Sequence, residues 1–299
     1  MPPNVKPSGE TLGATVEGID LGCPLAGADF AAILRALGEY GVLRFPGQRL
    51  DAVQLKAFAV RFGSLEINVA GAFQEPGHPE VMILSNIVED GRPIGARDAG
   101  QDWHTDMSYS ATIAFANVLY ALKVPTRAGR PLGGTEFANM HAAYAELPET
   151  TKRWLDGKTV LHDFNKFWEM MRQRPGSWRE PLSETQRLAK PPVSHPIFLV
   201  HPITGRKVLY ANPGYAIRIN ELPERESAEM LAFLFEHQLE QRYRYVHRWS
   251  EGDLLLWDDI GTLHNAHADY GPDEPRLIKR CQIMADRIFD PGFVRQALT

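Results

Sequence analysis

The segment His104-Thr105-Asp106 and the distant His264 are the residues of this chain best suited to hold a metal ion. Two imidazoles and one carboxylate form the three-ligand set typical of non-haem Fe(II) sites, which leaves the remaining coordination positions open. Four protein ligands would close the site and exclude a second reactant. The sequence therefore predicts a metal centre with room for small molecules at His104, Asp106 and His264.

His104 and Asp106 stand two positions apart, and side chains at that spacing project from the same face of an extended strand. A second pair of this kind, His267-Ala268-Asp269, means that the spacing alone does not select the site. Asp269 belongs to the turn sequence Asp-Tyr-Gly-Pro, where aspartate is common because it forms local hydrogen bonds. His104 instead lies where a polar loop is expected to enter a strand. We therefore expect the first pair to be the functional one.

Length, composition and charge limit the class of protein. The 299 residues are 44% hydrophobic and 23% charged, which is typical of a globular protein. A net charge of -5 without a long basic run gives no electrostatic support to a nucleic-acid partner. The sequence contains no apolar core of a signal peptide and no apolar run long enough to span a membrane. We expect Cys23 and Cys281 to be reduced thiols. We expect a cytoplasmic protein without a membrane partner.

Apolar periodicity and turn residues predict a β-rich chain with a few helices. The expected helices are 30–40, 51–63, 139–147, 149–155 and 224–241. Gly41 is the expected C-cap of the first helix. The second helix is expected to begin at its N-cap Asp51 and to end at Gly63, with an apolar face of Val53, Leu55, Phe58 and Phe62. The expected strands are 12–19, 41–46, 80–90, 112–124, 197–201, 207–211, 243–249, 253–257 and 277–285. This pattern favours one β-rich (α+β) domain over residues 1–299, with a double-stranded β-helix (jelly-roll, cupin-like) core and flanking helices.

Residues 162–192 differ from the rest of the chain in composition. Aromatic and methionine side chains alternate there with Arg, Gln, Gly and Pro. Such a segment suits a mobile or irregular insert better than a strand. Two alternatives stay open, namely an outer helix packed on the core and a lid over an apolar substrate.

Five motifs, in this order, are similar to those of the taurine dioxygenase/2,4-dichlorophenoxyacetate dioxygenase family. They are Trp103-His104-Thr105-Asp106, Gly133-Gly134-Thr135-Glu136-Phe137, the stretch His201 to Asn212 (His-Pro-x-Thr-Gly-Arg-Lys-x-Leu-Tyr-x-Asn), Trp257-Asp258 with His264 and Ala266, and Arg276 with Arg280. The resemblance runs from about Leu12 to the end. It implies a dioxygenase that uses Fe(II), 2-oxoglutarate and O2, and hydroxylates a C–H bond of a small anionic substrate (carboxylate, sulfonate or sulfate), with succinate and CO2 as co-products. A homo-oligomer, dimer or tetramer, is also implied.

The resemblance assigns a role to each motif residue. His104, Asp106 and His264 would be the iron ligands, Thr135 and Arg276 would hold the distal carboxylate of 2-oxoglutarate, and Arg280 would face the anionic group of the substrate. The physics agrees, because two arginines four positions apart in an apolar strand are expected on one face. Guanidinium groups that face inward are costly to bury unless anions meet them.

The chain departs from the family pattern at two places. The usual Trp-Asp-Asn-Arg reads Trp257-Asp258-Asp259-Ile260. The segment after Phe62-Gly63 has no histidine at the place where taurine dioxygenase offers one to the sulfonate, which disfavours taurine. We expect Asn68 and Phe73 to line the substrate pocket instead. The alternative function is a jelly-roll protein that binds metal or ligand without turnover.

Overall fold

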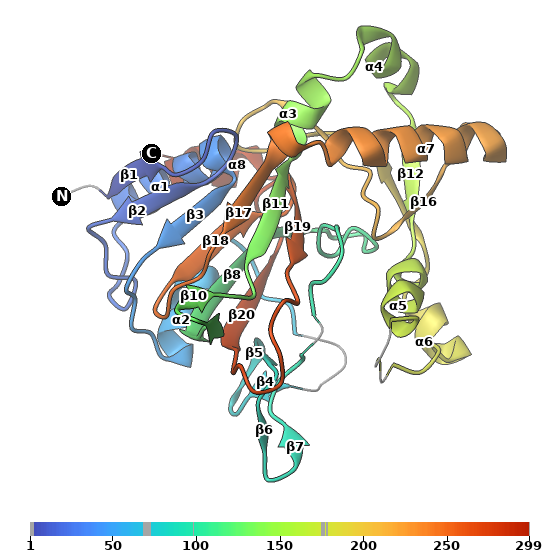
Figure 1. Ribbon diagram of the computed structural model, residues 1–299. Helices are drawn as coiled ribbons and strands as arrows, with labels where there is room; N and C mark the ends of the chain where they lie inside the picture. Colours follow the sequence, from blue (N-terminus) through green and yellow to red (C-terminus); the bar gives the residue numbers. More distant parts are fainter. Residues whose placement is uncertain (1–2, 68–72, 98, 175–176, 178, 299) are drawn as a thin grey trace.

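Strands from both ends of the sequence form the largest sheet. In a computed structural model, the described residues are 3–67, 73–97, 99–174, 177 and 179–298. The sheet has the strand order β1-β2-β3-β18-β8-β20-β5-β4 (Figure 1). Its strands are β1 (Asn4–Pro7), β2 (Ala14–Glu17), β3 (Val42–Phe45), β18 (Leu254–Asp258), β8 (Ala114–Lys123), β20 (Leu277–Met284), β5 (His78–Ser85) and β4 (Gln74–Glu75). The longest described strand, β8, pairs with β20 along most of its length.

A second, three-stranded sheet completes the core. Its order is β17 (Arg244–His247), β11 (Thr135–Asn139) and β19 (Thr262–Ala266), all antiparallel. Phe137 of β11 and Trp257 of β18 join the two sheets, with ring centroids 5.4 Å apart. Every residue of β18 is buried, because layers cover both faces of that strand. The two packed sheets form the β-rich jelly roll that the sequence predicts.

Three helices cover the outer side of the large sheet (Figure 1). They are α1 (Gly27–Tyr40), α2 (Ala52–Ala59) and α8 (Pro291–Leu298). The predicted apolar face of α1 is buried at Phe30, Ile33, Leu34 and Leu37. Gly41 ends α1 as expected, at a φ of 67° that favours glycine, and donates its N–H to the carbonyl of Leu37.

The helix α2 begins as predicted, but two of its expected residues behave differently. Asp51 caps it and forms a capping box with Gln54. Val53 is 59% exposed rather than part of the apolar face, because it lies about 200° around the helix from Leu55. Gly63 does not end the helix, which stops at Ala59.

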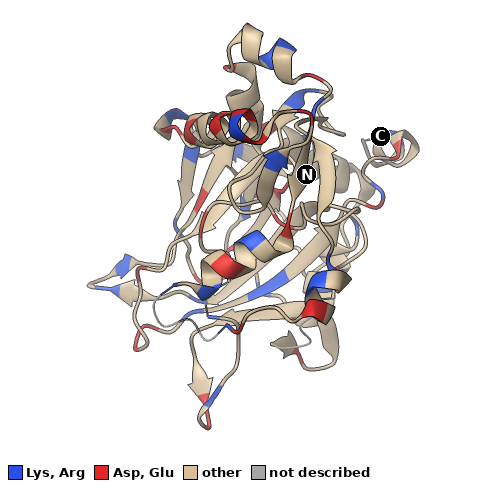
Figure 2. Ribbon diagram, turned by 90° about the vertical axis from the view of Figure 1, so that its right-hand side faces the viewer, with Lys and Arg blue, Asp and Glu red and all other residues tan. Residues whose placement is uncertain are grey.

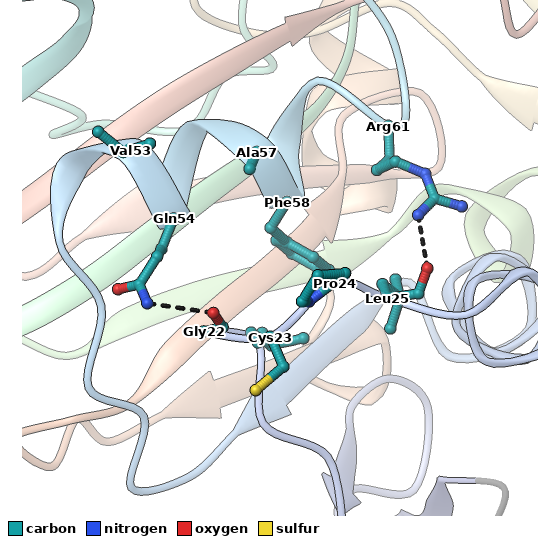
Figure 3. A pocket seen from close by; sticks show the side chains of 10 residues that line it. Gly22, Cys23, Pro24, Leu25, Val53, Gln54, Ala57, Phe58 and Arg61 are labelled. Carbon is teal, nitrogen blue, oxygen red and sulfur yellow. Dashed lines mark hydrogen bonds between the residues drawn. The ribbon is translucent and has the colours of Figure 1, made fainter.

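Val53 instead lines a surface pocket of about 330 Å³ between α2 and the loop after β2 (Figure 3). Gln54 and Arg61 hold that loop by hydrogen bonds to the carbonyls of Gly22 and Leu25, at 3.1 and 2.8 Å. These bonds fix the loop against α2 and the turn that follows it.

The remaining elements include several helices on the side of the core away from α1 (Figure 1). The predicted helices there are confirmed as α3 (Met140–Ala145), α4 (Glu149–Leu155) and α7 (Glu224–Gln238). The predicted hairpin is confirmed as β14 (Phe198–Val200) and β15 (Lys207–Leu209). The other elements are β6 (Val88–Glu89), β7 (Arg92–Pro93), β9 (Thr126–Arg127), β10 (Arg130–Pro131), β12 (Thr159–His162), β13 (Val193–Pro196), β16 (Ala216–Ile219) and the 3₁₀ helix η1 (Gln241–Tyr243).

The segment 162–192 starts and ends on paired strands. His162 of β12 lies opposite Val193 of β13 in an antiparallel ladder. Between them the described residues form α5 (Phe164–Arg172) and α6 (Glu184–Ala189). The expectation of an irregular segment is therefore wrong for these stretches, because the aromatic residues of α5 recur at helical spacing and Asp163 caps the helix.

Charged residues of both signs are interspersed over the ribbon (Figure 2). In the part of the chain that the structure describes, no helix is long and apolar enough to cross a membrane.

Candidate metal centre

The backbone brings His104 and His264 together. They form an isolated antiparallel bridge, in which each N–H donates to the carbonyl of the other residue, at 3.1 and 2.8 Å. His264 lies in β19, whereas His104 is followed by a turn that contains Asp106. The expectation of an extended strand through His104 and Asp106 is therefore wrong. The turn nevertheless carries the carboxylate back toward the two imidazoles.

The three side chains converge on one point. The Nε2 atom of His104 lies 3.3 Å from Oδ1 of Asp106, and the two imidazole centroids are 4.2 Å apart. One ligand atom from each of His104, Asp106 and His264 lies within 4.8 Å of the others, and all three residues are buried. His104 has its Nδ1 atom 2.7 Å from the carbonyl of Asp102, so that Nδ1 carries the proton and Nε2 is left as a ligand atom.

The electrostatics of the site favour the protonation states that a metal ion requires. Burial, reinforced by the nearby His104, lowers the pKa of His264 to about 3, so that its imidazole is neutral at pH 7. Burial raises the pKa of Asp106, but the close contact with His104 and the charge of Arg280 outweigh burial and hold this pKa well below its usual range. Neutral imidazoles and an ionised carboxylate are the forms that bind a divalent cation.

The second His-x-Asp pair has other partners. His267 lies 3.5 Å from a carboxylate oxygen of Glu136. Asp269 accepts a hydrogen bond of 2.7 Å from the N–H of Gly133, which is distant in sequence, so its role is not the local one that its turn sequence suggests. Neither residue belongs to a group of metal-binding geometry among the described residues.

A third set of similar composition, His141, His201 and Asp258, also lies close together, with His201 and Asp258 buried and His141 partly buried. Here Nδ1 of His201 accepts from the N–H groups of Ile203 and Thr204, both at 3.3 Å. Nε2 of His201 lies 3.0 Å from Oδ2 of Asp258. This close contact joins the β14–β15 hairpin to the end of β18.

Thr135 and Arg276 lie in one neighbourhood. Thr135 starts β11, directly opposite Ala266 of β19, and its Oγ1 accepts from the indole N–H of Trp249 at 3.1 Å. This bond leaves the hydroxyl proton to be donated elsewhere. Two positions earlier, a Cβ on Gly133 would lie 3.4 Å from Nε of Arg276. The guanidinium of Arg276 is buried, which lowers its pKa, and no ion pair joins it to a carboxylate within the described ranges.

Arg280 reaches the carboxylate of Asp106. Its Nη1 donates to Oδ2 of Asp106 at 3.2 Å and its Nη2 to Gln282 at 3.4 Å, while its buried Nε has no partner among the described residues. Next to β5 the register of β20 is regular from Leu277 to Arg280, and the register shift opposite β8 leaves out Leu122 of β8 rather than a residue of β20. The placement of Arg276 and Arg280 on one face stays a prediction.

Asn68 and Phe73 were expected to line a substrate pocket. Among the described residues, no contact links either of them to His104, Asp106 or His264. Asn68 lies outside the described residues. Phe73 has a φ of 63° and packs against an apolar cluster that includes Leu84 and Ile278. Its place near a substrate stays a prediction.

An aromatic wall covers one side of His104. The ring of Phe167 from α5 lies 4.7 Å from that imidazole, and the ring of Tyr215 lies 6.1 Å from it. Tyr109 stacks next to Tyr215 at 4.8 Å, and Nζ of Lys190 rests 5.0 Å from the Tyr109 ring. Sequence reasoning singled out Phe167 but missed Tyr109 and Tyr215, because neither belongs to a motif.

Two further polar residues that the motifs did not identify lie behind the triad. Asn117 and Asp259 are fully buried and share a hydrogen bond of 2.6 Å. Burial and the charge of Asp106 raise the pKa of Asp259 well above its ordinary value. The sequence could have pointed to Asn117, because it is the polar residue in the middle of the otherwise apolar run Ala114–Leu122.

A jelly-roll core that brings two imidazoles and one carboxylate to one point, next to two arginines, defines the class of non-haem iron dioxygenases that use 2-oxoglutarate. The family described as taurine catabolism dioxygenase TauD, TfdA family, matches residues 4–282. The chain belongs to this family.

Relatives agree with this assignment over nearly the whole chain. The 2,4-dichlorophenoxyacetate dioxygenase of Cupriavidus pinatubonensis, which is alpha-ketoglutarate-dependent, is 34% identical over 92% of this chain and 95% of its own. The pentalenolactone F synthase of Streptomyces avermitilis is 31% identical over 95% and 94%. The crystal structure of AAD-2 in complex with Mn(II) and N-oxalylglycine superposes with a TM-score of 0.78 at 26% identity, over 95% and 98%. The protein is a 2-oxoglutarate-dependent dioxygenase that uses Fe(II), 2-oxoglutarate and O2.

Proposed function

We propose that the protein hydroxylates a C–H bond of a small anionic substrate with a carboxylate, sulfonate or sulfate group. One oxygen atom of O2 enters the substrate and the other enters succinate, which forms from 2-oxoglutarate with release of CO2. The observation that carries the proposal is the convergence of His104, Asp106 and His264 next to the buried Nε of Arg280. If hydroxylation falls on a carbon that bears an ether, sulfonate or sulfate, the product collapses and releases that group.

Each residue of the site has a distinct task in this proposal. His104, Asp106 and His264 hold Fe(II), which supplies the activation of O2 when bound. Thr135 donates its hydroxyl proton, and Arg276 its guanidinium N–H groups, to the distal carboxylate of 2-oxoglutarate. Arg280 neutralises an anionic group of the substrate close to Asp106. Its buried Nε gives it a donor that the protein leaves for a ligand.

The segment 162–192 is proposed as the lid over the substrate. Phe167 reaches His104 from α5, and Arg174 bonds to Gln101 and Asp102 in the loop that precedes His104. An aromatic wall of this kind suits a substrate with an apolar body as well as an acidic group. The phenoxyacetate and pentalenolactone chemistry in the names of the relatives fits that description.

Four earlier expectations remain predictions. They are a single domain over residues 1–299, a homo-oligomer of two or four chains, a cytoplasmic location, and the absence of nucleic-acid and membrane partners.

The proposal is tested by measuring succinate formation from 2-oxoglutarate after anaerobic loading with Fe(II) and admission of air. Sulfonates, alkyl sulfates, aryloxyalkanoates and amino-acid-like carboxylates are added in turn. We expect one of these classes to stimulate succinate release, with the hydroxylated or cleaved product formed in equal amount. Stimulation by an uncharged analogue as strong as that by its acid would contradict the anionic substrate. Turnover that persists in His104→Ala would contradict the metal centre.

A further inference from the structure

Asp259 occupies a fully buried position behind the candidate metal centre. Its Oδ1 accepts the indole N–H of Trp257 at 3.0 Å, and its Oδ2 accepts an amide N–H of Asn117 at 2.6 Å. The same Oδ1 is 3.7 Å from Nδ1 of His264, a buried nitrogen that has no hydrogen-bond partner among the described residues. The Asp259 carboxylate is thus the acceptor toward which the outer nitrogen of His264 is turned.

Asn117 extends this contact to a second member of the triad. Its Nδ2 donates both to Asp259 and to Oδ2 of Asp106, the latter at 2.9 Å, while its Oδ1 has no partner within the described part of the chain. Two acceptors on one side therefore fix the orientation of the Asn117 amide. Asp259 reaches His264 directly and Asp106 through Asn117.

Only a side chain with two acceptor oxygens satisfies this arrangement. An asparagine at position 259, where the family motif has one, offers a single acceptor oxygen and an NH2 group. It accepts from either Trp257 or Asn117, and its NH2 then faces the other donor. If the NH2 faces Asn117, Asn117 must turn its amide, and the N–H that holds Asp106 is lost. If the NH2 faces Trp257, the indole N–H loses its acceptor.

We propose that Asp259 is a positioning residue of the metal centre, which orients His264 and Asp106 together. The inference rests on the proposed role of His104, Asp106 and His264 as metal ligands. Carboxylates that accept from the outer nitrogen of a ligating histidine fix its tautomer and raise its basicity, and their loss costs about 10–100-fold in metal affinity.

The experiment compares Asp259→Asn with the wild-type protein by titration with Co(II), which binds without turnover. The matched control is Asp286→Asn, an exposed aspartate that accepts one backbone N–H, that of Ser64, at 3.0 Å. We expect the dissociation constant for Co(II) to rise about 10–100-fold in Asp259→Asn, with a changed visible absorption spectrum of bound Co(II), and to stay within about twofold in the control. Unchanged affinity together with an unchanged spectrum overturns the proposal.

Two further measurements show whether a weaker affinity for Co(II) comes from lost positioning of the ligands or from a general loss of stability, and whether Asn117 takes part. For each variant, the melting temperature with Co(II) is compared with the melting temperature of the same variant without metal. A general loss of stability lowers both temperatures and therefore does not affect their difference. A smaller rise in Asp259→Asn supports positioning, whereas an equal rise overturns it. In a double-mutant cycle with Asn117→Ala, affinity losses that are less than additive support the path through Asn117, and full additivity overturns that path.

The same Co(II) titration shows whether the assignment of His104, Asp106 and His264 as metal ligands is itself wrong. If the wild-type protein binds Co(II) no more tightly than His264→Ala, the metal centre itself is wrong. If the wild type binds tightly and Asp259→Asn equals it in affinity and spectrum, the metal centre stands and the role of Asp259 is overturned.

Discussion

His104 and His264 are joined to each other through their backbones. Each N–H donates to the other carbonyl, at 3.1 and 2.8 Å, and the two rings lie 4.2 Å apart. The pair is an isolated bridge beside the sheet β17-β11-β19, so the position of one imidazole relative to the other is set by strand pairing. A site made in this way is largely preorganised, and metal binding does not need to gather distant loops.

Replacing His264 and His267 separately should give opposite results. We expect His264→Ala to weaken Co(II) or Fe(II) binding by more than about 100-fold, because a direct ligand matters more than the outer-sphere contacts that are worth 10–100-fold. His267→Ala should bind metal as the wild type does, since His267 is paired with Glu136 rather than with the triad. Metal titration of both variants measures the difference. Equal losses would show that the wrong histidine has been chosen.

Changes at Thr135 and Arg276 should act on 2-oxoglutarate and leave the metal in place. Arg276→Lys keeps the positive charge but loses the two parallel N–H donors of the guanidinium group. A charge-assisted hydrogen bond is worth about 1.5–3 kcal/mol, so we expect this variant to raise the KM for 2-oxoglutarate by roughly 10–150-fold. Thr135→Val removes one hydroxyl and should raise that KM by about 2–10-fold. Steady-state kinetics test both variants. An unchanged KM with a normal affinity for Co(II) would place the co-substrate elsewhere.

Gly63 should be needed for close packing against β20. A Cβ at this position would collide with the carbonyl oxygen of Met284 and lie 2.9 Å from a carboxylate oxygen of Asp286. We expect Gly63→Ala to lower the free energy of unfolding by about 1–3 kcal/mol. Gly27→Ala, at the start of α1, meets nothing within 4 Å and should be neutral or slightly stabilising. Urea unfolding compares them, and equal stability of the two variants would refute the packing argument.

The stability of the fold should fall in mild acid partly because of His162. Burial, with a smaller effect of His195, lowers the pKa of His162 to about 3 from its ordinary value of 6.5. Between these values the unfolded chain binds a proton that the folded chain does not, so stability is lost as the pH falls from 6.5 toward 3. His162→Gln should lose about 2 kcal/mol less than the wild type between pH 7 and pH 5. Unfolding curves at both pH values test this, and parallel losses would exclude His162 as a cause.

The sequence by itself determined the chemistry of the site and the type of most elements. His104, Asp106 and His264 were predicted from residue type and spacing, and Thr135 and Arg276 from the resemblance of their motifs to those of the family. The helix α1 with its cap at Gly41 followed from apolar spacing. Such features are local, because a motif, a cap or an amphipathic face is encoded within a few consecutive residues.

Tertiary structure alone decided which distant residues meet. The bridge between His104 and His264, the turn that returns Asp106 to them, and the placement of Asp259 behind His264 depend on strand order and register. Phe167 meets His104 because the β12–β13 ladder anchors the segment that carries it. The extra residue Leu122, which shifts the register of β8 against β20, could not be foreseen from either strand alone. Pairing between strands far apart in the chain is a non-local interaction, and no periodicity within one segment specifies it.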